Sequence, residues 1–322
     1  METPLYTLRF SPWFRTMVWG GERILPWKGV SGNLPKIGES WEISGYGEHL
    51  TLVDNGPLRG HSTIWLGSVY KEQLLGKHVY KEYGDQFPLL IKFIDAHSDL
   101  SIQVHPDDEM AKRVHGPEFR GKTEMWYVIA AAPGAALYCG LSRDVTREEY
   151  QQRVADGTIT DILARYEVQP GDVFFLPPGR IHAICSGCLL AEIQQTSDLT
   201  YRIWDYGRPG LDGKPRQLHT ELALQAIDFR VLPTYKTSYQ PLKDTPVELV
   251  KCKYFTTTLY DLTRPFDVPT DDSFLTVICV QGSGLVDGEH IHAGETLLVP
   301  ACRIAASCIP SSEGLKLLVS RC

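Results

Sequence analysis

The feature that most constrains the fold is a stretch of sequence that occurs twice. Residues 171–183 read GDVFFLPPGRIHA, and residues 294–306 read GETLLVPACRIAA. In both copies a glycine and an acidic residue precede a short apolar run, which is followed by a proline and by an Arg-Ile pair. Glycine and proline mark turns, and a short apolar run between two turns indicates a buried strand. The chain is therefore expected to build the same turn–strand–turn unit in two small β-domains.

The rest of the chain is also mostly typical of β-structure. Short apolar, β-branched or aromatic runs at residues 88–94, 125–129 and 172–176 predict strands, and turn signals separate them. Few segments predict helices: residues 62–76, with Ser62 as a possible cap and Gly76 as a stop, residues 145–164, and residues 220–228.

The expected domain boundary lies in a stretch of about residues 230–246 that contains three prolines. We expect a first domain over residues 1–240, with a short helical insertion near 145–164, and a second domain over residues 241–322. The predicted fold class is mainly β, with two antiparallel barrels and a few short helices.

Charge and length exclude several function classes. The formal net charge of −7 and the pI of about 5.8 argue against nucleic-acid binding. No apolar run approaches the length of a membrane helix, and the first residues show no signal-peptide pattern. We interpret the eight cysteines, including the Cys185-Ser-Gly-Cys188 pair, as reduced thiols of a cytoplasmic protein rather than a zinc or redox motif.

The two copies differ at one chemically important position, because His182 of the first copy corresponds to Ala305 of the second. The first copy fits the string Gly-x5-Pro-x-Gly-x2-His, which resembles the second signature of the cupin superfamily of metal-holding jelly-roll β-barrels. The first cupin signature supplies a His-x-His pair and a later Glu, and its equivalents here are Gln103, His105 and Glu124.

This resemblance implies a metal site made of Gln103, His105, Glu124 and His182 in the first barrel. Gln103 and His105 are two residues apart on a probable strand, so their side chains share a face. Such a nitrogen and oxygen donor set suits Zn²⁺, and Fe²⁺, Mn²⁺ or Co²⁺ are chemically allowed. The second copy is expected to be a degenerate barrel without metal ligands. The nearby His290-Ile-His292 is expected to lie on a surface turn.

Longer motifs narrow the resemblance to one family. Residues 99–109 (DLSIQVHPDDE), 121–126 (GKTEMW) and 197–202 (SDLTYR) resemble the short bacterial form of the type I mannose-6-phosphate isomerases. Trp19-Gly-Gly and residues 38–41 (GESW) resemble the N-terminal motifs of that family. The resemblance implies one Zn²⁺ per chain and a small sugar phosphate as partner. It also implies interconversion of mannose 6-phosphate and fructose 6-phosphate through an enediol or enediolate.

By motif match, the active-site arginine of the family falls on Arg202, its lysine beside the metal-binding Glu falls on Lys122, and an acidic residue falls on Asp198. Lys122 and Arg202 are also predicted to bind substrate, and Arg180 is a further predicted phosphate ligand. Asp198, Lys122 and a metal-bound water are all open as the general base. Longer members of the family have a tyrosine where this chain has Ile184. They also have His-Lys-Pro-Glu where this chain has Gly-Lys-Thr-Glu at residues 121–124.

Two other functions fit the same residues. Two histidines and one carboxylate would also suit Fe²⁺ in a cupin dioxygenase. A cupin could alternatively bind a sugar phosphate without catalysis. The sequence predicts no oligomeric state.

Overall fold

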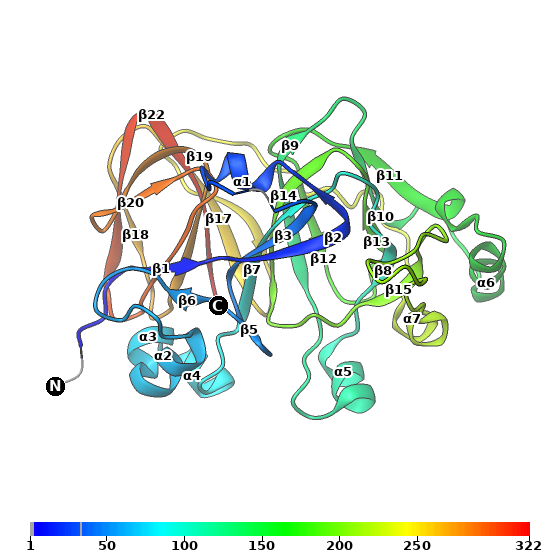
Figure 1. Ribbon diagram of the computed structural model, residues 1–322, viewed down its shortest axis with the longest axis horizontal. Coiled ribbons are helices and arrows are strands. Elements are labelled where there is room, and N and C mark those ends of the chain that lie inside the picture. Colours follow the sequence, from blue (N-terminus) through cyan, green and yellow to red (C-terminus); the bar gives the residue numbers. More distant parts are fainter. Residues whose placement is uncertain (1–2, 33) are drawn as a thin grey trace.

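The computed structural model describes residues 3–32 and 34–322, and it is mainly β with a few short helices, as predicted. The strands form two groups that lie side by side in Figure 1. One group, drawn mostly in blue, cyan and green, contains most of the strands from β2 to β15, and the other, drawn mostly in yellow, orange and red, contains the C-terminal strands together with β1 and β6. None of the helices in the described part of the chain is long and apolar enough to cross a membrane.

The first group consists of two antiparallel sheets with a hydrophobic core between them. One sheet has six strands in the order β12 (Val173–Leu176), β9 (Glu124–Ala131), β14 (Cys188–Gln195), β7 (Leu89–Asp95), β3 (Ile37–Ile43) and β2 (Trp13–Gly21). The other has five, in the order β11 (Leu163–Glu167), β10 (Ala136–Leu141), β13 (His182–Ile184), β8 (Ile102–Val104) and β15 (Tyr201–Trp204). Buried residues of both sheets, such as Trp126 and Leu137, pack in one cluster.

The second group is a single nine-stranded sheet. Its main path runs β16 (Val247–Lys251), β17 (Thr256–Leu262), β22 (Ala305–Arg321), β19 (Leu275–Val286), β21 (Thr296–Val299), β1 (Leu8–Ser11) and β6 (Leu52–Val53). β18 (Phe266–Pro269) pairs with β22, and β20 (Glu289–His292) pairs with β19. Because β1 and β6 come from the N-terminal part of the chain, the sheet pairing crosses the predicted boundary at residue 240. The division into two domains and the closure of each into a barrel stay predictions.

The repeated sequence does form a repeated structure. β12 and β21 each begin two residues after a glycine of positive φ, which is +93° at Gly171 and +91° at Gly294. After the proline turn, β13 begins at His182 and β22 begins at Ala305. The imidazole and the methyl group therefore occupy the same position in the two copies.

The helices agree in part with the predicted segments. The predicted helix at 62–76 is two helices, α2 (Thr63–Tyr70) and α3 (Glu72–Leu75), because Lys71 between them has a φ of +51°. The side chain of Ser62 caps α2, and Gly76 follows α3 as expected. The other predicted segments contain α6 (Arg147–Ala155) with the 3-10 turn η1 (Ile159–Ile162), and α7 (Thr220–Ala226). Three further helices were not predicted: α1 (Ile24–Trp27), α4 (Lys77–Tyr83) and α5 (Asp108–His115).

A buried ion pair connects the two groups of strands. Lys28 Nζ lies 2.7 Å from Glu42 Oε2, both side chains are only 4% exposed, and the same ammonium donates to the carbonyl of Gly294 in the second copy of the repeat. Ser40 donates its hydroxyl to the other oxygen of Glu42. A side chain added at Gly294 would meet Lys28, so glycine is required there for space as well as for its backbone conformation.

Replacement of Lys28 by methionine is expected to destabilise the protein by about 3–5 kcal/mol, because it leaves the Glu42 carboxylate buried without its cation. The free energy of unfolding in urea measures this loss. As a matched control, Arg59→Ala removes the exposed ion pair between Arg59 and Asp54, and it should cost less than about 1 kcal/mol. Equal losses in the two variants would contradict the importance of the buried pair.

Candidate metal centre and the adjoining cavity

Three predicted metal ligands meet between the two sheets of the first group. Glu124 is the first residue of β9 in the six-stranded sheet, His182 is the first residue of β13 in the five-stranded sheet, and His105 directly follows β8. Their ligand atoms all lie within 4.8 Å of one another. Glu124 Oε2 is 3.5 Å from His105 Nε2, and Glu124 Oε1 is 3.3 Å from His182 Nε2. All three side chains are at most 1% exposed.

Backbone carbonyls orient both imidazoles. His105 Nδ1 lies 2.9 Å from the carbonyl oxygen of Leu199, and His182 Nδ1 lies 2.8 Å from that of Arg180. A carbonyl only accepts hydrogen bonds, so each Nδ1 carries the proton and each Nε2 keeps its lone pair. Burial lowers the pKa of His182 to about 3 and also lowers the pKa of His105, so both rings are neutral. Neutral imidazoles held in this way are typical metal ligands.

Unsatisfied polar atoms at the centre of this cluster fit a cation. His105 Nε2 and both carboxylate oxygens of Glu124 are buried and have no hydrogen-bond partner among the described residues. Lys122 Nζ forms an ion pair with Glu124 Oε2 at 2.9 Å, without hydrogen-bond geometry. Although burial opposes ionisation, the Lys122 ammonium holds the pKa of Glu124 well below its usual range. A buried carboxylate that stays charged beside two lone pairs is a suitable place for a metal ion.

The fourth predicted ligand, Gln103, lies beside His182. Gln103 on β8 pairs in register with His182 on β13, and its Nε2 lies 3.3 Å from His182 Nε2. Rotation of the amide about its last side-chain bond would present the oxygen at that position. The structure thus brings together all four residues that the cupin resemblance implied.

A cavity of about 200 Å³ adjoins this cluster, and Gln103 and Lys122 line it. The predicted residues Asp198 and Arg202 also line it, as does Ile184, which takes the place of the family tyrosine. Several lining residues were not predicted. The titratable ones among them are Arg15, Glu39, Lys92, Glu192, Arg216 and His219.

Alternating charges cover one wall of this cavity. Lys92 Nζ lies 3.7 Å from Glu39, 3.6 Å from Glu192 and 3.7 Å from Asp198. Lys122 Nζ lies 3.9 Å from Glu192 Oε1, an oxygen that has no hydrogen-bond partner among the described residues. Burial raises the pKa of Glu192, and the nearby Glu124 adds to this effect. Burial also opposes the charge of Asp198, but Lys92 and Arg15 outweigh burial and lower its pKa.

The sequence does contain a signal for some of these missed residues. Lys92 interrupts the apolar run at 88–94, and Glu192 interrupts the apolar start of β14. A single charged side chain inside a buried strand is costly unless it is paired or functional. Glu39 belongs to the GESW motif, whereas Arg15 and Arg216 belong to no sequence motif that indicates a functional role.

Arg202 faces the cavity without an acidic partner. No carboxylate within residues 3–32 and 34–322 forms an ion pair with it, because Asp205 is held by Arg208 and Arg216. Its guanidinium instead donates to Ser101 Oγ and to the carbonyl of Gln217. Burial and the neighbouring Arg216 lower the pKa of Arg202. The part of the cavity beside Arg202 therefore has an excess of positive charge.

Arg180 does not line the cavity. Its guanidinium lies 4.6 Å from the ring centroid of Tyr235, and its carbonyl orients His182. The structure thus gives Arg180 a packing partner away from the predicted phosphate site.

The remaining sequence interpretations concern thiols and the second His-x-His pair. His290 and His292 are exposed on the β19–β20 hairpin, as predicted. Cys185 and Cys188 are free and buried at a turn, and burial raises their pKa values to about 12 and about 11. Both findings agree with non-catalytic roles.

The family and the relatives that match this chain carry the same activity in their names. The family description "Phosphomannose isomerase type I, catalytic domain" matches residues 8–125. The chain is 35% identical over 312 residues to "Probable mannose-6-phosphate isomerase GmuF" of Bacillus subtilis (strain 168), covering 94% of each protein. It is 33% identical over 295 residues to the mannose-6-phosphate isomerase of Streptococcus mutans, covering 88% of this chain and 89% of that protein.

The fold of this chain is also similar to that of a solved structure. The crystal structure of the mannose 6-phosphate isomerase from Bacillus subtilis matches with a TM-score of 0.87 and 32% identity, over 98% of this chain and 99% of that chain. The similarity therefore includes the first group of strands, the linking residues and the C-terminal sheet.

Proposed function

We infer that this chain, which belongs to the type I phosphomannose isomerase family, is a mannose-6-phosphate isomerase. The reaction moves a proton between C1 and C2 of a hexose 6-phosphate, so that the carbonyl group passes between C1 and C2 through an enediol or enediolate. The observation that carries this inference is similarity over nearly the full length to proteins of this name, combined with a buried His-Glu-His cluster beside a charged cavity.

We propose that Gln103, His105, Glu124 and His182 hold one Zn²⁺. Support comes from the neutral imidazoles, from the buried Glu124 oxygens, which have no hydrogen-bond partner among the described residues, and from the position of the Gln103 amide. Bound there, the ion supplies positive charge that stabilises negative charge on the sugar oxygens at C1 and C2. A nitrogen and oxygen set with one carboxylate suits zinc, and the amide as fourth ligand favours a sugar site over an oxygen-activating iron site.

Arg202 is proposed to bind the phosphate group. Its guanidinium has no competing carboxylate, and Arg216 at the same cavity shares Asp205 with Arg208, so that these two arginines keep a net positive charge. A forked guanidinium suits a phosphate dianion because it can donate two parallel hydrogen bonds. Since Arg202 pairs in register with Gln103, a phosphate held there would fix the sugar beside the metal ligands.

We propose that proton transfer uses the charged wall of the cavity that contains Lys92, Lys122, Glu192 and Asp198. Lys122 and Asp198 face the cavity, as the predicted catalytic roles require, and we add Glu192 because one of its buried oxygens has no hydrogen-bond partner among the described residues. Lys122 can donate to a sugar oxygen, while a carboxylate can accept the carbon-bound proton. Ion pairs with Lys92 keep both carboxylates in place.

A coupled assay with mannose 6-phosphate tests the proposed function. We expect the purified protein to form fructose 6-phosphate. Chelation should lower the rate by more than about a hundredfold, and one equivalent of zinc per chain should restore it. Full turnover by metal-free protein would contradict the proposed metal. Substrate-dependent oxygen uptake would support the dioxygenase alternative, and binding of mannose 6-phosphate without turnover would support a non-catalytic protein.

The cytoplasm is the proposed location. All eight cysteines are free, and Cys139, Cys279 and Cys308 are buried in the sheets. Free thiols in these numbers are typical of a reducing compartment.

A further inference from the structure

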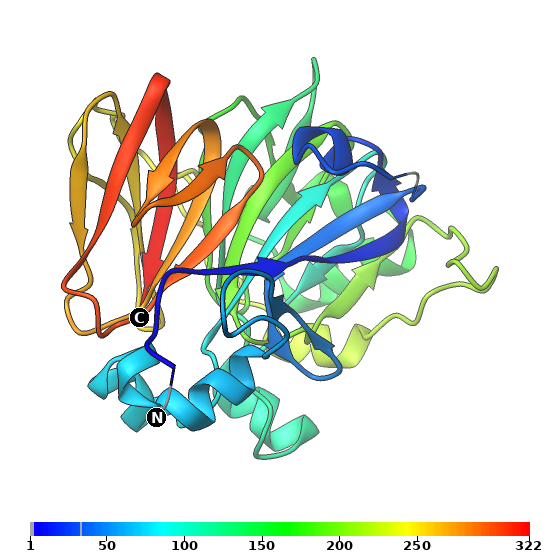
Figure 2. The ribbon, with the colours of Figure 1, turned by 60° about the vertical axis from the view of Figure 1, so that its left-hand side comes forward.

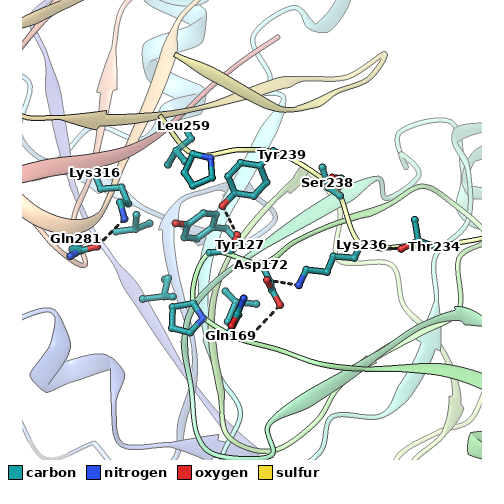
Figure 3. A pocket seen from close by; sticks show the side chains of 17 residues that line it. Tyr127, Gln169, Asp172, Thr234, Lys236, Ser238, Tyr239, Leu259, Gln281 and Lys316 are labelled. Carbon is teal, nitrogen blue, oxygen red and sulfur yellow. Dashed lines mark hydrogen bonds and ion pairs between the residues drawn. The ribbon is translucent and has the colours of Figure 1, made fainter. Parts of the chain in front are cut away.

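A second and larger cavity lies between the two groups of strands. Its volume is about 570 Å³, which is within the range of roughly 300–1,000 Å³ that is typical of small-molecule sites. Three parts of the chain form its walls: β9 with the turn at 169–172, the linking residues 234–241, and strands of the C-terminal sheet (Figure 3). The proposed metal ligands do not line it. The C-terminal group of strands, drawn in yellow to red in Figure 2, thus contributes residues to the wall of this cavity.

This cavity lies on the opposite face of the strand that carries Glu124. Side chains alternate along β9, so Glu124 and Trp126 point toward one face of the sheet and Tyr127 and Ile129 point toward the other. Tyr127 and Ile129 line the large cavity, whereas Trp126 contacts His182 edge-on at 5.2 Å. A molecule bound in the large cavity could therefore be present together with the hexose phosphate.

The charges of the cavity favour an anion. On one wall Lys236 Nζ pairs with Asp172 at 2.6 Å, and these two charges cancel. On the other wall Lys316 Nζ lies 3.6 Å from Asp261, which stands behind the cavity lining and also pairs with Lys243 at 2.7 Å. One ammonium charge therefore remains uncompensated. Lys316 Nζ uses one donor on Gln281 Oε1 at 3.0 Å, and an ammonium has three donors.

The middle of the cavity favours a flat ring. The side chains of Tyr127 and Tyr239 lie between Lys316 and Lys236 in Figure 3, and Leu259 forms part of the same wall as Lys316. The Tyr239 hydroxyl donates to the carbonyl of Gly171, which holds its ring in place. Aromatic rings and aliphatic side chains with few polar groups at the edge are the usual surroundings of a bound ring.

The two copies of the repeat differ in what lies beside their first glycine, which is Gly171 in one copy and Gly294 in the other. The carbonyl of Gly294 receives Lys28, and a side chain at Gly294 would collide with Lys28 and contact Trp27. The carbonyl of the equivalent Gly171 receives Tyr239 instead, and Gly171 borders the open cavity. The space beside the repeated turn is thus filled by protein in one copy and open in the other.

We propose that this cavity is a binding site for a small organic anion that carries a flat ring and one phosphate or carboxylate. The anionic group lies at Lys316, and the ring lies against Tyr127 and Tyr239. This proposal does not depend on the isomerase activity, because it is tested by binding.

Calorimetric titration of the zinc-loaded protein with adenosine 5′-monophosphate tests the proposal, since this probe joins a flat ring to one phosphate. We expect saturable binding of one molecule per chain. Adenosine and inorganic phosphate, which are its two halves, should each bind at least about tenfold more weakly. Lys316→Ala should weaken binding of the nucleotide at least about tenfold with unchanged isomerase turnover. Lys251→Ala removes an exposed lysine of β16 outside the cavity and should change nothing.

Val280→Trp provides a second test, because Val280 lines the cavity and the larger side chain would fill it. This variant should lose binding while its isomerase turnover shows that it is folded. The proposal is overturned if the nucleotide does not bind saturably, if Lys316→Ala binds it as well as the unchanged protein, or if a mannose 6-phosphate and fructose 6-phosphate mixture displaces it. Displacement would place the nucleotide in the catalytic cavity.

Discussion

Replacement of His182 by alanine is expected to abolish both metal binding and isomerase activity. The imidazole is buried, its Nδ1 proton is held by a carbonyl, and its Nε2 points at Glu124. Without it the site keeps a carboxylate, one imidazole and one amide, too few ligands to hold zinc against dialysis. Turnover should fall by at least about a thousandfold, because the charge that stabilises the sugar oxygens leaves with the metal. Metal content after dialysis and the rate with mannose 6-phosphate measure the two effects.

The chain offers a matched control for this variant. His292→Ala removes an exposed imidazole from the His-x-His pair of the second copy. It should keep one zinc per chain and full turnover. If His182→Ala retained zinc and activity, the proposed centre would be wrong. If His292→Ala lost zinc, the second copy would hold the metal instead.

The metal cluster could be predicted from the sequence because its members stand in local patterns. Gln103 on β8 and His105 directly after it are two residues apart, and His182 ends a string of turn residues that also marks its strand. Lys122 lies near Glu124 for the same local reason. The repeat predicted its own backbone as well, since both copies show a glycine of positive φ followed by a strand.

Long-range pairing explains what could not be predicted. The cavity takes Arg15, Glu39, Lys92 and Glu192 from β2, β3, β7 and β14, which become neighbours only when the six-stranded sheet forms. The spacing of residues in the sequence does not indicate which strands become neighbours in the sheet. In the same way, β1 pairs with β21 almost three hundred residues later, and no local pattern in the sequence indicates this pairing.

Helix α5 was not predicted because its capping residues lie inside another sequence motif. Asp107 accepts a hydrogen bond from the backbone N–H of Met110 at 2.8 Å, and Asp108 and Glu109 occupy the first turn of α5. These are ordinary start signals for a helix. They lie inside the QVHPDDE string, where the resemblance to a family accounted for the same residues without reference to a helix.

Replacement of Arg202 by alanine is expected to leave the metal in place and to lower kcat/KM by at least about a hundredfold. Arg202 contacts Ser101 and Gln217 rather than the metal ligands, so zinc content should stay at one per chain. A lost bidentate contact to phosphate weakens binding, and a sugar that is no longer held beside the metal ligands also reacts more slowly. Both a higher KM and a lower kcat should therefore be measured.

Arg230→Ala is the matched control, because Arg230 is 85% exposed and pairs with Asp228 outside the catalytic cavity. Its kcat and KM should equal those of the unchanged protein. Lysine at position 202 keeps the charge but lacks the planar fork, so Arg202→Lys should recover only part of the lost rate. Full activity of Arg202→Ala would remove this residue from the phosphate site. Arg15 and Arg216 would then be the remaining arginines that line the cavity, and the sugar phosphate would have to bind in another orientation.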